Sequence, residues 1–599
     1  MEPEDLRDLD DFSKVEEAFI NCYGNNKSKP LRILTGLYKG YYHKFVLSGV
    51  YFILKHACVW VLPIVTANII NISMSRRVDG LNAIALNLFV ILCLVAINYP
   101  ANYLYTKNRS KAVRYVEAGL RGAMVRKLQQ LSISYHKVMQ SGRLQSKIMR
   151  DVEAIETLSQ QLFLNILNIA LNLIVALSVT ISKSWVVFLF FLISGPLASA
   201  TIVAFKAKIK KTNSEFRKEM EETSARVMEM VELIPVTRAH ALEHEEILKM
   251  EEQLNLVAEK GYRLDIVQAN FGAASWVMFQ VFQILCLGFT GYLAFQGEIK
   301  VGDITLYQTY FATVVNQVSS FINLLPVISK GLESVNSVGE ILLADDIEND
   351  KGKKILLKVK GEFEFRDVKF SYDDSKPVLN GLNLKVKQGE TIAFVGESGA
   401  GKSTILNLVI GFIKANEGQI MLDGHEINEI NLRSYRRHLA VVPQNSILFS
   451  GTIRDNITYG MPSVSEKKLR EVLQAANLTS FIESLPDGIE TKVSEHGGSL
   501  SGGQRQRISI ARALIRDPKV IVLDEATSAL DSISEKEIQN ALRNLTKGRT
   551  TFIVAHRLST IRDADKIAVI NQGVCTEYGD FQELMKIKGE FYQMRQLQN

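Results

Sequence analysis

The chain has 599 residues, too many for one hydrophobic core, so two or three domains are predicted. Its 70 basic and 64 acidic residues leave a net charge of +6, too mild at this length to favour a nucleic-acid-binding protein. Hydrophobic residues make up 47% of the chain, but long apolar runs alternate with charged runs only in its first half. The second half has the composition of a soluble domain.

The chain begins with an acidic, polar stretch, "MEPEDLRDLDDF". A cleavable signal peptide needs a basic start and an apolar core, so we expect the N-terminus to stay in the cytosol. The following "LRILTGLYKGYYHKF" mixes basic residues with Leu, Ile and Tyr. This mixture suits a helix lying on the inner leaflet or, alternatively, a helix packed on the protein. Residues 1–43 are assigned to this N-terminal segment.

Apolar stretches long enough to cross a bilayer, which takes about 20 helical residues, come next. They are predicted at 44–72, 83–105, 160–182, 185–206, 267–296 and 303–328. Residues 44–330 are therefore predicted to form a transmembrane domain of about six helices. The even number of spans places both ends of this domain on one side of the membrane.

Basic residues orient these spans. Eleven Lys or Arg lie between Lys107 and Arg150, and a similar number lies between Lys206 and Arg263, whereas the other three connections hold one or two each. The positive-inside rule then places the two long loops and both termini in the cytosol. The long loops have helical spacing with few Gly or Pro, so we expect the membrane helices to continue into the cytosol.

Amide side chains recur in the third span. Gln161, Asn165, Asn168 and Asn172 follow at steps of four, three and four, which places them on one helix face. Hydrogen bonds between the side chains of membrane helices average only about 0.6 kcal/mol. Stabilising the helix packing is therefore a weak reason for four amide side chains on one face. We hypothesise that Asn165, Asn168 and Asn172 line a cavity for an amphipathic cargo with hydrogen-bonding groups, such as a peptide. The alternative is that they join helices.

The second half, predicted as a linker over 331–360 and a nucleotide-binding domain over 361–599, contains a phosphate-binding loop. "GESGAGKS" fits GxxxxGK[ST] and lies between an apolar strand, "TIAFV", and an apolar helix. Its glycines let backbone N–H groups converge on phosphate, Lys402 reaches the β and γ oxygens, and Ser403 ligates Mg²⁺. The predicted ATP contacts here are Gly396, Glu397, Ser398, Gly399, Ala400, Gly401, Lys402, Ser403 and Thr404.

Two acidic residues end a later strand, "VIVL" at 520–523. Asp524 is suited to hold Mg²⁺, directly or through water. Glu525 can polarise the attacking water as a general base. The pair gains weight from the phosphate loop upstream.

A second glycine-rich loop, "LSGGQ" at 500–504, opens a helix but has no lysine. Its N–H groups and the Ser501 hydroxyl can point at a γ-phosphate. A phosphate loop encloses ATP from one side only, so we infer that this second loop serves the ATP held by another copy of the domain. The residues predicted to act in trans are Ser501, Gly502, Gly503 and Gln504.

The motifs "GESGAGKS", "LSGGQRQR", "VIVLDEATSALD" and "IVAHRLS", in this order, resemble the nucleotide-binding domain of ATP-binding-cassette (ABC) transporters. With about six spans before the cassette, the whole chain is similar to the exporter half-transporters of that superfamily. The resemblance implies an all-α six-helix transmembrane domain with long cytosolic helix extensions, followed by an α/β P-loop ATPase domain. It implies ATP-driven export of an amphipathic or hydrophobic cargo (peptide, drug or lipid) by alternating access.

The resemblance also implies residue roles. Tyr372 matches the aromatic that stacks on adenine, the alternative being a core tyrosine, and Gln444 matches the glutamine that touches Mg²⁺ and water. Asp531 matches the residue that communicates between the two sites, and His556 the histidine that contacts the γ-phosphate and holds Glu525. The implied catalytic set is Glu525, His556, Gln444 and Lys402, and the implied Mg²⁺ ligands are Ser403, Gln444 and Asp524. Turns of the cytosolic loops are expected near Gly142 and Pro235.

Two positions depart from the family pattern: Ser494 stands where glycine is usual, and Phe581 where histidine is common. The catalytic positions all match. Both sites of a homodimer could therefore hydrolyse ATP, and the expected partner is a second copy of the chain or a related half-transporter.

The rival function is an ATP-gated channel or regulatory subunit of the same superfamily, against which intact Glu525 and His556 argue. The expected location is the cell membrane, with the ATPase domain in the cytosol. The Lys-, Ile- and Asn-rich composition is typical of an AT-rich bacterial genome. Drug, lipid and peptide cargoes are not distinguished by the sequence.

Overall fold

The computed structural model describes residues 14–26, 29–75, 80–139, 141–372, 377–494, 497–498, 500–524, 532–555 and 558–596. The chain divides into two compact units. After the sequence-based expectations, we name residues 1–129 and 141–345 the membrane unit, and residues 130–140 and 346–599 the ATPase unit. The short segment 130–140, which follows the second long helix, thus belongs to the ATPase unit.

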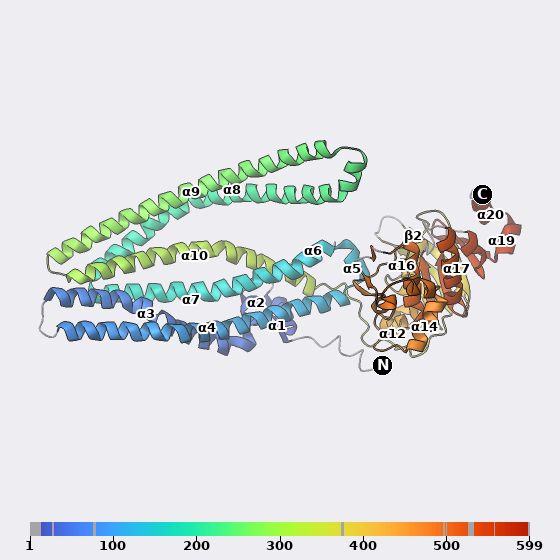
Figure 1. The fold of residues 1–599 in the computed structure, drawn as a ribbon, viewed down its shortest axis with the longest axis horizontal. Helices are drawn as coiled ribbons and strands as arrows, with labels where there is room; N and C mark the ends of the chain where they lie inside the picture. Colours follow the sequence, from blue (N-terminus) through green and yellow to red (C-terminus); the bar gives the residue numbers. More distant parts are fainter. Residues whose placement is uncertain are drawn as a thin grey trace. The chain divides into compact units, whose positions relative to one another are not determined.

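The described part of the membrane unit is helical (Figure 1). Its elements are α1 (Lys14–Asn26), α2 (Pro30–Leu37), the 3₁₀ turn η3 (Lys39–Tyr41), α3 (Tyr42–Ser75), α4 (Gly80–Gln130), α6 (Ser141–Ser146), the π-helical turn η4 (Lys147–Asp151), α7 (Val152–Lys183), α8 (Trp185–Ala239), α9 (Glu243–Phe295) and α10 (Val301–Leu342). α4, α8 and α9 are the longest.

The long helices α3, α4, α7, α8, α9 and α10 coincide with the six predicted spans. Among the described residues, five of them are long and apolar enough to cross a membrane, and α8 adds a shorter apolar stretch, Trp185–Ser194. The 51 residues of α4 extend for about 75 Å, more than twice the roughly 30 Å of a bilayer core. These helices therefore continue well beyond a bilayer, as the loop composition predicted.

The turns between the long helices lie close to the expected positions. α8 runs through Pro235 and ends at Ala239, and the chain reverses at 240–242, where Ala241 has a left-handed φ of 54°. Gly142 lies in α6, between α4 and α7. At the other end of the unit, α10 continues through residues 331–342, which the sequence analysis assigned to the linker.

Two groupings organise the membrane unit. α10 packs on α3, α7 and α9, while α8 and α9 form a long hairpin whose tip bends away from α7 and α10 (Figure 1). The N-terminal α2 buries Ile33, Leu34 and Leu37. This burial favours the alternative of a helix packed on the protein at this position.

The ATPase unit is an α/β domain. Its helices are α5 (Ile133–Val138), α11 (Lys402–Ile410), α12 (Leu432–Arg436), α13 (Ile453–Ile457), α14 (Glu466–Ala475), α15 (Thr479–Glu483), α16 (Gly502–Leu514), α17 (Ser532–Thr546), α18 (Leu558–Arg562), α19 (Phe581–Ile587) and α20 (Glu590–Gln596), with 3₁₀ turns η5 (Ile427–Glu429) and η6 (Gly488–Glu490). Its strands are β1 (Phe363–Ser371), β2 (Pro377–Val386), β3 (Thr391–Val395), β4 (Glu417–Leu422), β5 (His425–Glu426), β6 (Leu439–Val442), β7 (Gly451–Thr452), β8 (Lys492–Val493), β9 (Val520–Asp524), β10 (Thr550–Val554), β11 (Lys566–Asn571) and β12 (Val574–Gly579).

Two sheets enclose the core of this unit. The larger has the order β12-β11-β3-β10-β9-β6 and is parallel except for β12; the smaller, β2-β1-β4-β5, is antiparallel. β3, β9 and β10 are almost continuously buried, the pattern of parallel strands covered on both faces. α11 lies in the apolar core shared by the two sheets, and α16 packs in a second core on the other side of the large sheet.

Candidate functional site: a nucleotide-binding edge of the parallel sheet

The phosphate-binding loop connects β3 to α11, as predicted. At Gly396, φ is 153°, and an added Cβ would lie 2.1 Å from the carbonyl oxygen of Ile570. At Gly401, the N-cap of α11, φ is 102°, and an added Cβ would lie 2.8 Å from Leu379 Cδ2. The backbone can therefore hold this curve only without side chains at these two positions. A glycine N-cap also places no side-chain acceptor over the first N–H groups of α11, which suits a phosphate.

Lys402 is the first residue of α11, and its side chain is only 6% exposed. Its Nζ donates to the carbonyl oxygens of Gly396 and Glu397, each at 2.8 Å. These bonds hold the ammonium over the loop, beside the N–H groups. The next residue, Ser403, is exposed and presents its hydroxyl on the surface of the loop.

The sheet register brings further site residues to the same edge. Asp524 pairs with Val554 on β10, and Val554 pairs with Phe394 on β3, two residues before Gly396. Neighbouring strands are about 4.8 Å apart, so Asp524 lies about 10 Å across the sheet from the strand that leads into the phosphate loop. Gln444, exposed, follows β6, which is the neighbour of β9 on its other side. The carboxyl ends of parallel strands are the usual ligand edge of such sheets.

Tyr372 is 57% exposed, which excludes the alternative of a core tyrosine. Its ring stands edge-on to Phe370, with ring centroids 4.9 Å apart, and its hydroxyl lies 3.3 Å from Thr404 Oγ1 in α11. The tyrosine therefore presents an aromatic face next to the phosphate-loop helix.

The second glycine loop forms the start of α16. Ser501 is its N-cap: the Ser501 Oγ accepts from the Gln504 N–H at 3.2 Å, and Gln504 Oε1 accepts from the Ser501 N–H at 2.8 Å. This reciprocal pair is a capping box, which the spacing Ser-x-x-Gln could have indicated. Ser501 and Gly502 are exposed, whereas Gly503 is buried.

Three residues implied by the resemblance, Glu525, Asp531 and His556, lie outside the described residues. Of the two departures, Ser494 follows β8 and its carbonyl accepts from the Gly497 N–H. Phe581 begins α19 and packs edge-on against Phe591, with centroids 5.7 Å apart. Each of the two departing residues thus makes a contact with a residue close by in the chain.

A buried amide that the sequence analysis missed organises the loop after Gln444. Asn456 is fully buried; its Nδ2 donates to the carbonyls of Phe449 and Thr452, and its Oδ1 accepts from the Phe449 N–H. Arg512, on α16, donates to Asn456 Oδ1 at 2.9 Å and to the Ile447 carbonyl at 3.1 Å. Burial lowers the pKa of Arg512, although arginine stays charged in proteins. The pair joins the Gln444 loop to the helix that begins with Ser501.

The amide side chains predicted to share one face of the third span form hydrogen bonds, some within α7 and one with another helix. Asn172 is buried; its Oδ1 accepts from Trp60 Nε1 at 2.7 Å, and its Nδ2 donates to Asn168. Asn165 is half-buried and donates to Gln161. Asn172 therefore joins α7 to α3, the alternative weighed for this face.

Near the N-terminal end of α7, the same face borders a hollow lined by both acidic and basic side chains. A cavity of about 400 Å³ between α4 and α7 is lined by Arg114, Glu117, Arg121, Glu153, Glu156, Thr157, Gln160 and Gln161. Glu117 and Glu156, both nearly buried, bind Arg114 at 2.8 and 2.7 Å, and Glu117 also binds Arg121. Four of the five charged residues that line this hollow are thus paired with one another, Glu153 being the fifth.

Comparisons with known proteins agree with this geometry. The family model for the ABC transporter matches residues 379–528, and that for the ABC transporter transmembrane region matches residues 45–318. An ATP-dependent lipid A-core flippase of Syntrophus aciditrophicus is 32% identical over 540 residues, which cover 88% of this chain and 87% of the relative. A putative multidrug export ATP-binding/permease protein of Bacillus subtilis is 33% identical over 519 residues, 86% of this chain and 89% of the relative.

A solved structure is similar along nearly the whole chain. It is that of a bacterial Atm1-family ABC exporter with ATP bound, with a TM-score of 0.80 and 25% identity over 93% of this chain and 98% of that one. The predicted family, fold class and activity class are confirmed. The chain belongs to the ABC transporters: it is an exporter half-transporter, a multi-pass membrane domain fused to an ATPase domain that binds ATP.

Proposed function

We propose that two copies of this chain act together to export an amphipathic cargo, each round being driven by hydrolysis of Mg²⁺-bound ATP at the edge of the parallel sheet. The observation that carries the proposal is the glycine cradle of β3 and α11, which shares a sheet edge with Asp524 in a chain whose other half is membrane helices. In this proposal the cargo moves from the cytosol or the inner leaflet outward.

The residues at this edge divide the work of phosphoryl transfer. The N–H groups of the loop and Lys402 neutralise the β- and γ-phosphate charge. Ser403, Asp524 and Gln444 supply oxygen atoms, the ligands that Mg²⁺ prefers. Glu525 acts as general base on the attacking water, with His556 holding it, and Tyr372 stacks on the adenine. Glu525→Gln should still bind ATP but hydrolyse it at most at about one-hundredth of the wild-type rate; retained multi-turnover hydrolysis would contradict the role given to Glu525.

A second copy completes the site through the loop at Ser501. Its capping box uses the Ser501 N–H and leaves the N–H groups of Gly502 and Gly503 at the positive end of α16, where they suit a γ-phosphate held by the partner. A mixed dimer, with Lys402→Ala in one protomer and Ser501→Ala in the other, tests this arrangement. Because both changes then fall on the same composite site, the other site stays intact, and about half the activity should remain. A dimer carrying both changes in each protomer should be inactive.

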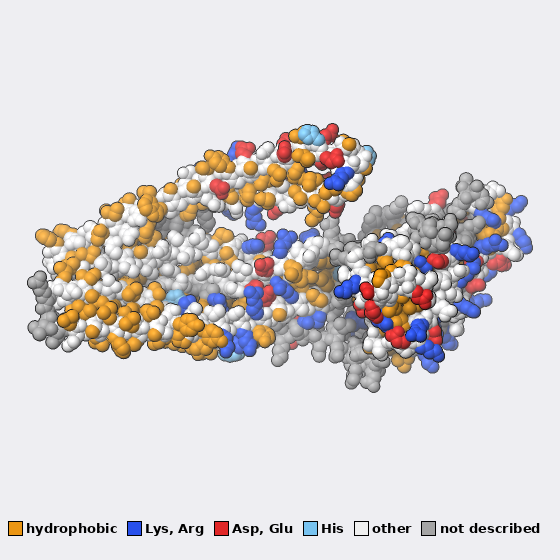
Figure 2. All heavy atoms as spheres, viewed as in Figure 1, with side chains coloured by type: hydrophobic (Ala, Val, Ile, Leu, Met, Phe, Trp, Pro, Cys, Tyr) orange, Lys and Arg blue, Asp and Glu red, His pale blue; other side chains and the backbone are white. Residues whose placement is uncertain are grey.

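The apolar surface of the α8–α9 hairpin supports pairing with a second copy. Figure 2 shows hydrophobic side chains along this hairpin, beyond the predicted spans 185–206 and 267–296. The exposed apolar residues near its tip include Met228, Val231, Ile234, Val236, Ile247 and Leu248. A patch of this kind outside the lipid marks a protein interface. Met228→Asp with Ile247→Asp should lower the dimer fraction measured by light scattering in detergent.

The named relatives suggest lipids and drugs as cargo classes, and the amide face suggests hydrogen-bonding groups on the cargo. We propose that Asn165 and Asn168 contact the cargo when the membrane unit opens, while Asn172 also joins α7 to α3. Uptake of the dye Hoechst 33342 and flipping of labelled lipid A, both in inverted vesicles, test the two classes. Asn165→Ala with Asn168→Ala should weaken uptake of the accepted cargo several-fold, whereas unchanged uptake would remove these residues from the cargo path.

Inverted vesicles also separate an exporter from the rival ATP-gated channel. Accumulation against a gradient that requires ATP hydrolysis fits the exporter, while ATP-dependent equilibration without accumulation fits the channel. In the proposed topology the ATPase unit and both termini face the cytosol of a bacterial cell, so the ATPase unit should be accessible to protease in inverted vesicles. Protection of that unit would reverse the proposed orientation.

A further inference from the structure

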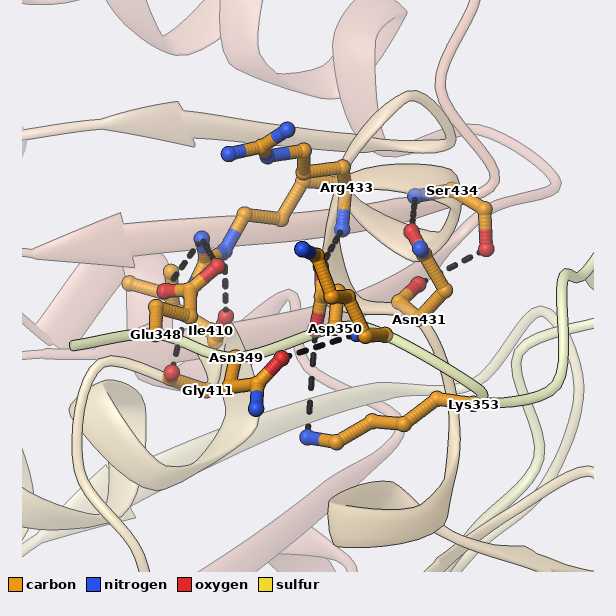
Figure 3. A network of polar contacts seen from close by, with 11 residues as sticks. Glu348, Asn349, Asp350, Lys353, Ile410, Gly411, Asn431, Arg433 and Ser434 are labelled. Carbon is orange, nitrogen blue, oxygen red and sulfur yellow. Dashed lines mark hydrogen bonds and ion pairs between the residues drawn. The ribbon is translucent and has the colours of Figure 1, made fainter. Parts of the chain in front are cut away.

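The segment that follows α10 is held on the ATPase unit by a series of polar contacts. Figure 3 shows Glu348 beside Ile410 and Gly411, and Asp350 facing Arg433. Asp350 Oδ2 accepts from the Arg433 N–H at 3.2 Å, and farther along, the Asn431 N–H donates to the Lys354 carbonyl at 2.8 Å. Residues 346–354, named here the docking segment, therefore lie along the start of α12.

The docking segment also pairs with the chain that leaves α4. Leu131 and Ile347 form an antiparallel bridge. The Ser132 N–H donates to the Asp346 carbonyl at 2.9 Å, and the Glu348 N–H donates to the Gln130 carbonyl at 2.8 Å. The exits of two membrane helices, α4 and α10, are thus joined by one short ladder inside the ATPase unit.

The side chain of Glu348 continues this ladder to α12. Both of its carboxylate oxygens accept from Arg436 Nη1, at 2.8 and 2.9 Å. Arg436 in turn donates from Nε to the Ile410 carbonyl at 3.0 Å and from Nη2 to the Gly411 carbonyl at 2.8 Å. One guanidinium therefore bridges the docking segment and the C-terminus of α11.

The carbonyls that Arg436 binds are those left without partners at the end of a helix, where a positive charge is favourable. Tyr435 supports the same end, because its hydroxyl donates to the Val409 carbonyl at 2.9 Å. The other end of α11 carries Lys402 and the phosphate loop. A nine-residue helix is about 13 Å long and buried in the core, so it moves as a unit, and a shift at its C-terminus reaches the phosphate loop.

We propose that Arg436 is a positioning residue for the phosphate loop that binds ATP, and that its ion pair with Glu348 links the phosphate-loop helix to the exits of α4 and α10. Arg436 touches no reacting atom. Arg436 acts through α11, and its ion pair with Glu348 makes its position depend on that of the docking segment. The proposal rests on the function proposed above and adds to it a physical route between the ATP site and two membrane helices.

The test uses the full chain in lipid nanodiscs of phosphatidylethanolamine and phosphatidylglycerol, and it requires no cargo. Hydrogen–deuterium exchange is measured with and without ATP and vanadate, in peptides covering α11, residues 120–130 and residues 335–345. In the wild type, nucleotide should alter exchange in all three. In Glu348→Gln, which keeps the size but removes the charge, α11 should keep its protection, and the change at the two helix ends should fall at least two-fold.

A kinetic measurement addresses Arg436 itself. Arg436→Lys keeps the charge but cannot reach the carboxylate and both carbonyls with a planar fork. We expect its KM for ATP to rise at least three-fold, with kcat and Tm nearly unchanged. The matched control for Glu348→Gln is Glu364→Gln, which removes an exposed ion pair with Arg366 on β1, 2.7 Å long, in the same unit.

Several outcomes would overturn the proposal. If nucleotide did not alter hydrogen–deuterium exchange at the wild-type ends of α4 and α10, no change would be transmitted to them. If Glu348→Gln left that alteration unchanged, the ion pair between Glu348 and Arg436 would not be the link. Joint loss of α11 protection and thermal stability in Glu348→Gln would make the pair part of folding alone. Since none of these readouts uses cargo, failure here is distinguishable from failure of the export function.

Discussion

The two units of this chain place their polar side chains by different physical means. In the ATPase unit, the phosphate loop, Asp524 and Gln444 all lie at or just beyond the carboxyl ends of strands of one sheet, so the register of these parallel strands fixes their spacing. In the membrane unit, Asn172 and the paired charges of the hollow at Glu117 and Glu156 depend on how long helices pack. A site built on strand ends is rigid and local, whereas one built on helix faces changes whenever the helices move.

The largest effect on activity is expected from a substitution in the phosphate loop, directly after strand β3. Gly396→Ala would press a methyl group against the Ile570 carbonyl, 2.1 Å away, and displace the phosphate loop. We expect ATP hydrolysis to fall at least about 100-fold, which corresponds to about 2.7 kcal/mol. Gly424→Ala, in open space at a φ of 81°, is the control and should cost only about 1 kcal/mol of stability with activity retained. Equal activity of the two variants would contradict the rigid cradle.

The next test concerns buried polar groups in the ATPase unit. Asn456→Ala removes the amide that serves Phe449, Thr452 and Arg512, leaving their buried groups unpaired. We expect a loss of about 2–4 kcal/mol, read as a lower Tm by differential scanning calorimetry. The control is Asn428→Ala, whose half-buried amide has a single long contact of 3.4 Å with Glu426. A loss of stability no larger than that of Asn428→Ala would show that Asn456 does not organise this loop.

The corresponding change in the membrane unit should be weaker. Trp60→Phe keeps an aromatic ring but removes the bond of 2.7 Å to Asn172. Bonds between membrane helices average about 0.6 kcal/mol and reach about 1.7 kcal/mol. The shift of Tm, measured in the same detergent, should therefore be smaller than for Asn456→Ala. A larger shift would reverse the contrast between the units.

The smallest effect is expected from a surface pair. A hydrogen bond from Arg549, 3.0 Å away, holds the pKa of Asp517 below its usual value of about 3.9. Because the folded state lowers this pKa, the contribution to stability is present above about pH 4 and is lost as the pH falls through the lowered value. Asp517→Asn should cost less than about 1 kcal/mol at pH 7 and nothing in strong acid. Thermal unfolding at the two pH values, with exposed Asp487→Asn as control, measures this.

The same contrast explains what could be predicted from the sequence. A glycine loop between a strand and a helix encodes its own geometry, so the position of the loop over 396–403 between β3 and α11 could be predicted. Apolar runs encode the presence of spans, but the partner of each polar face depends on tertiary packing. The sequence therefore left open whether the amide face joins helices, as the bond between Trp60 and Asn172 does. Similarly, Arg436 has no local motif, because its role arises from carbonyls at Ile410 and Gly411 and a carboxylate 88 residues earlier in the chain.

The reciprocal bonds at Ser501 have a consequence for how variants of this residue are interpreted. Alanine here would remove a hydroxyl group and, at the same time, the signal that starts the helix, so reduced turnover would mix two causes. Asparagine begins helices as well as serine but carries no hydroxyl. Comparing Ser501→Asn with Ser501→Ala therefore separates helix initiation from direct contact with nucleotide: equal defects would assign the serine to the ligand, and a milder defect in the asparagine variant would assign it to the helix.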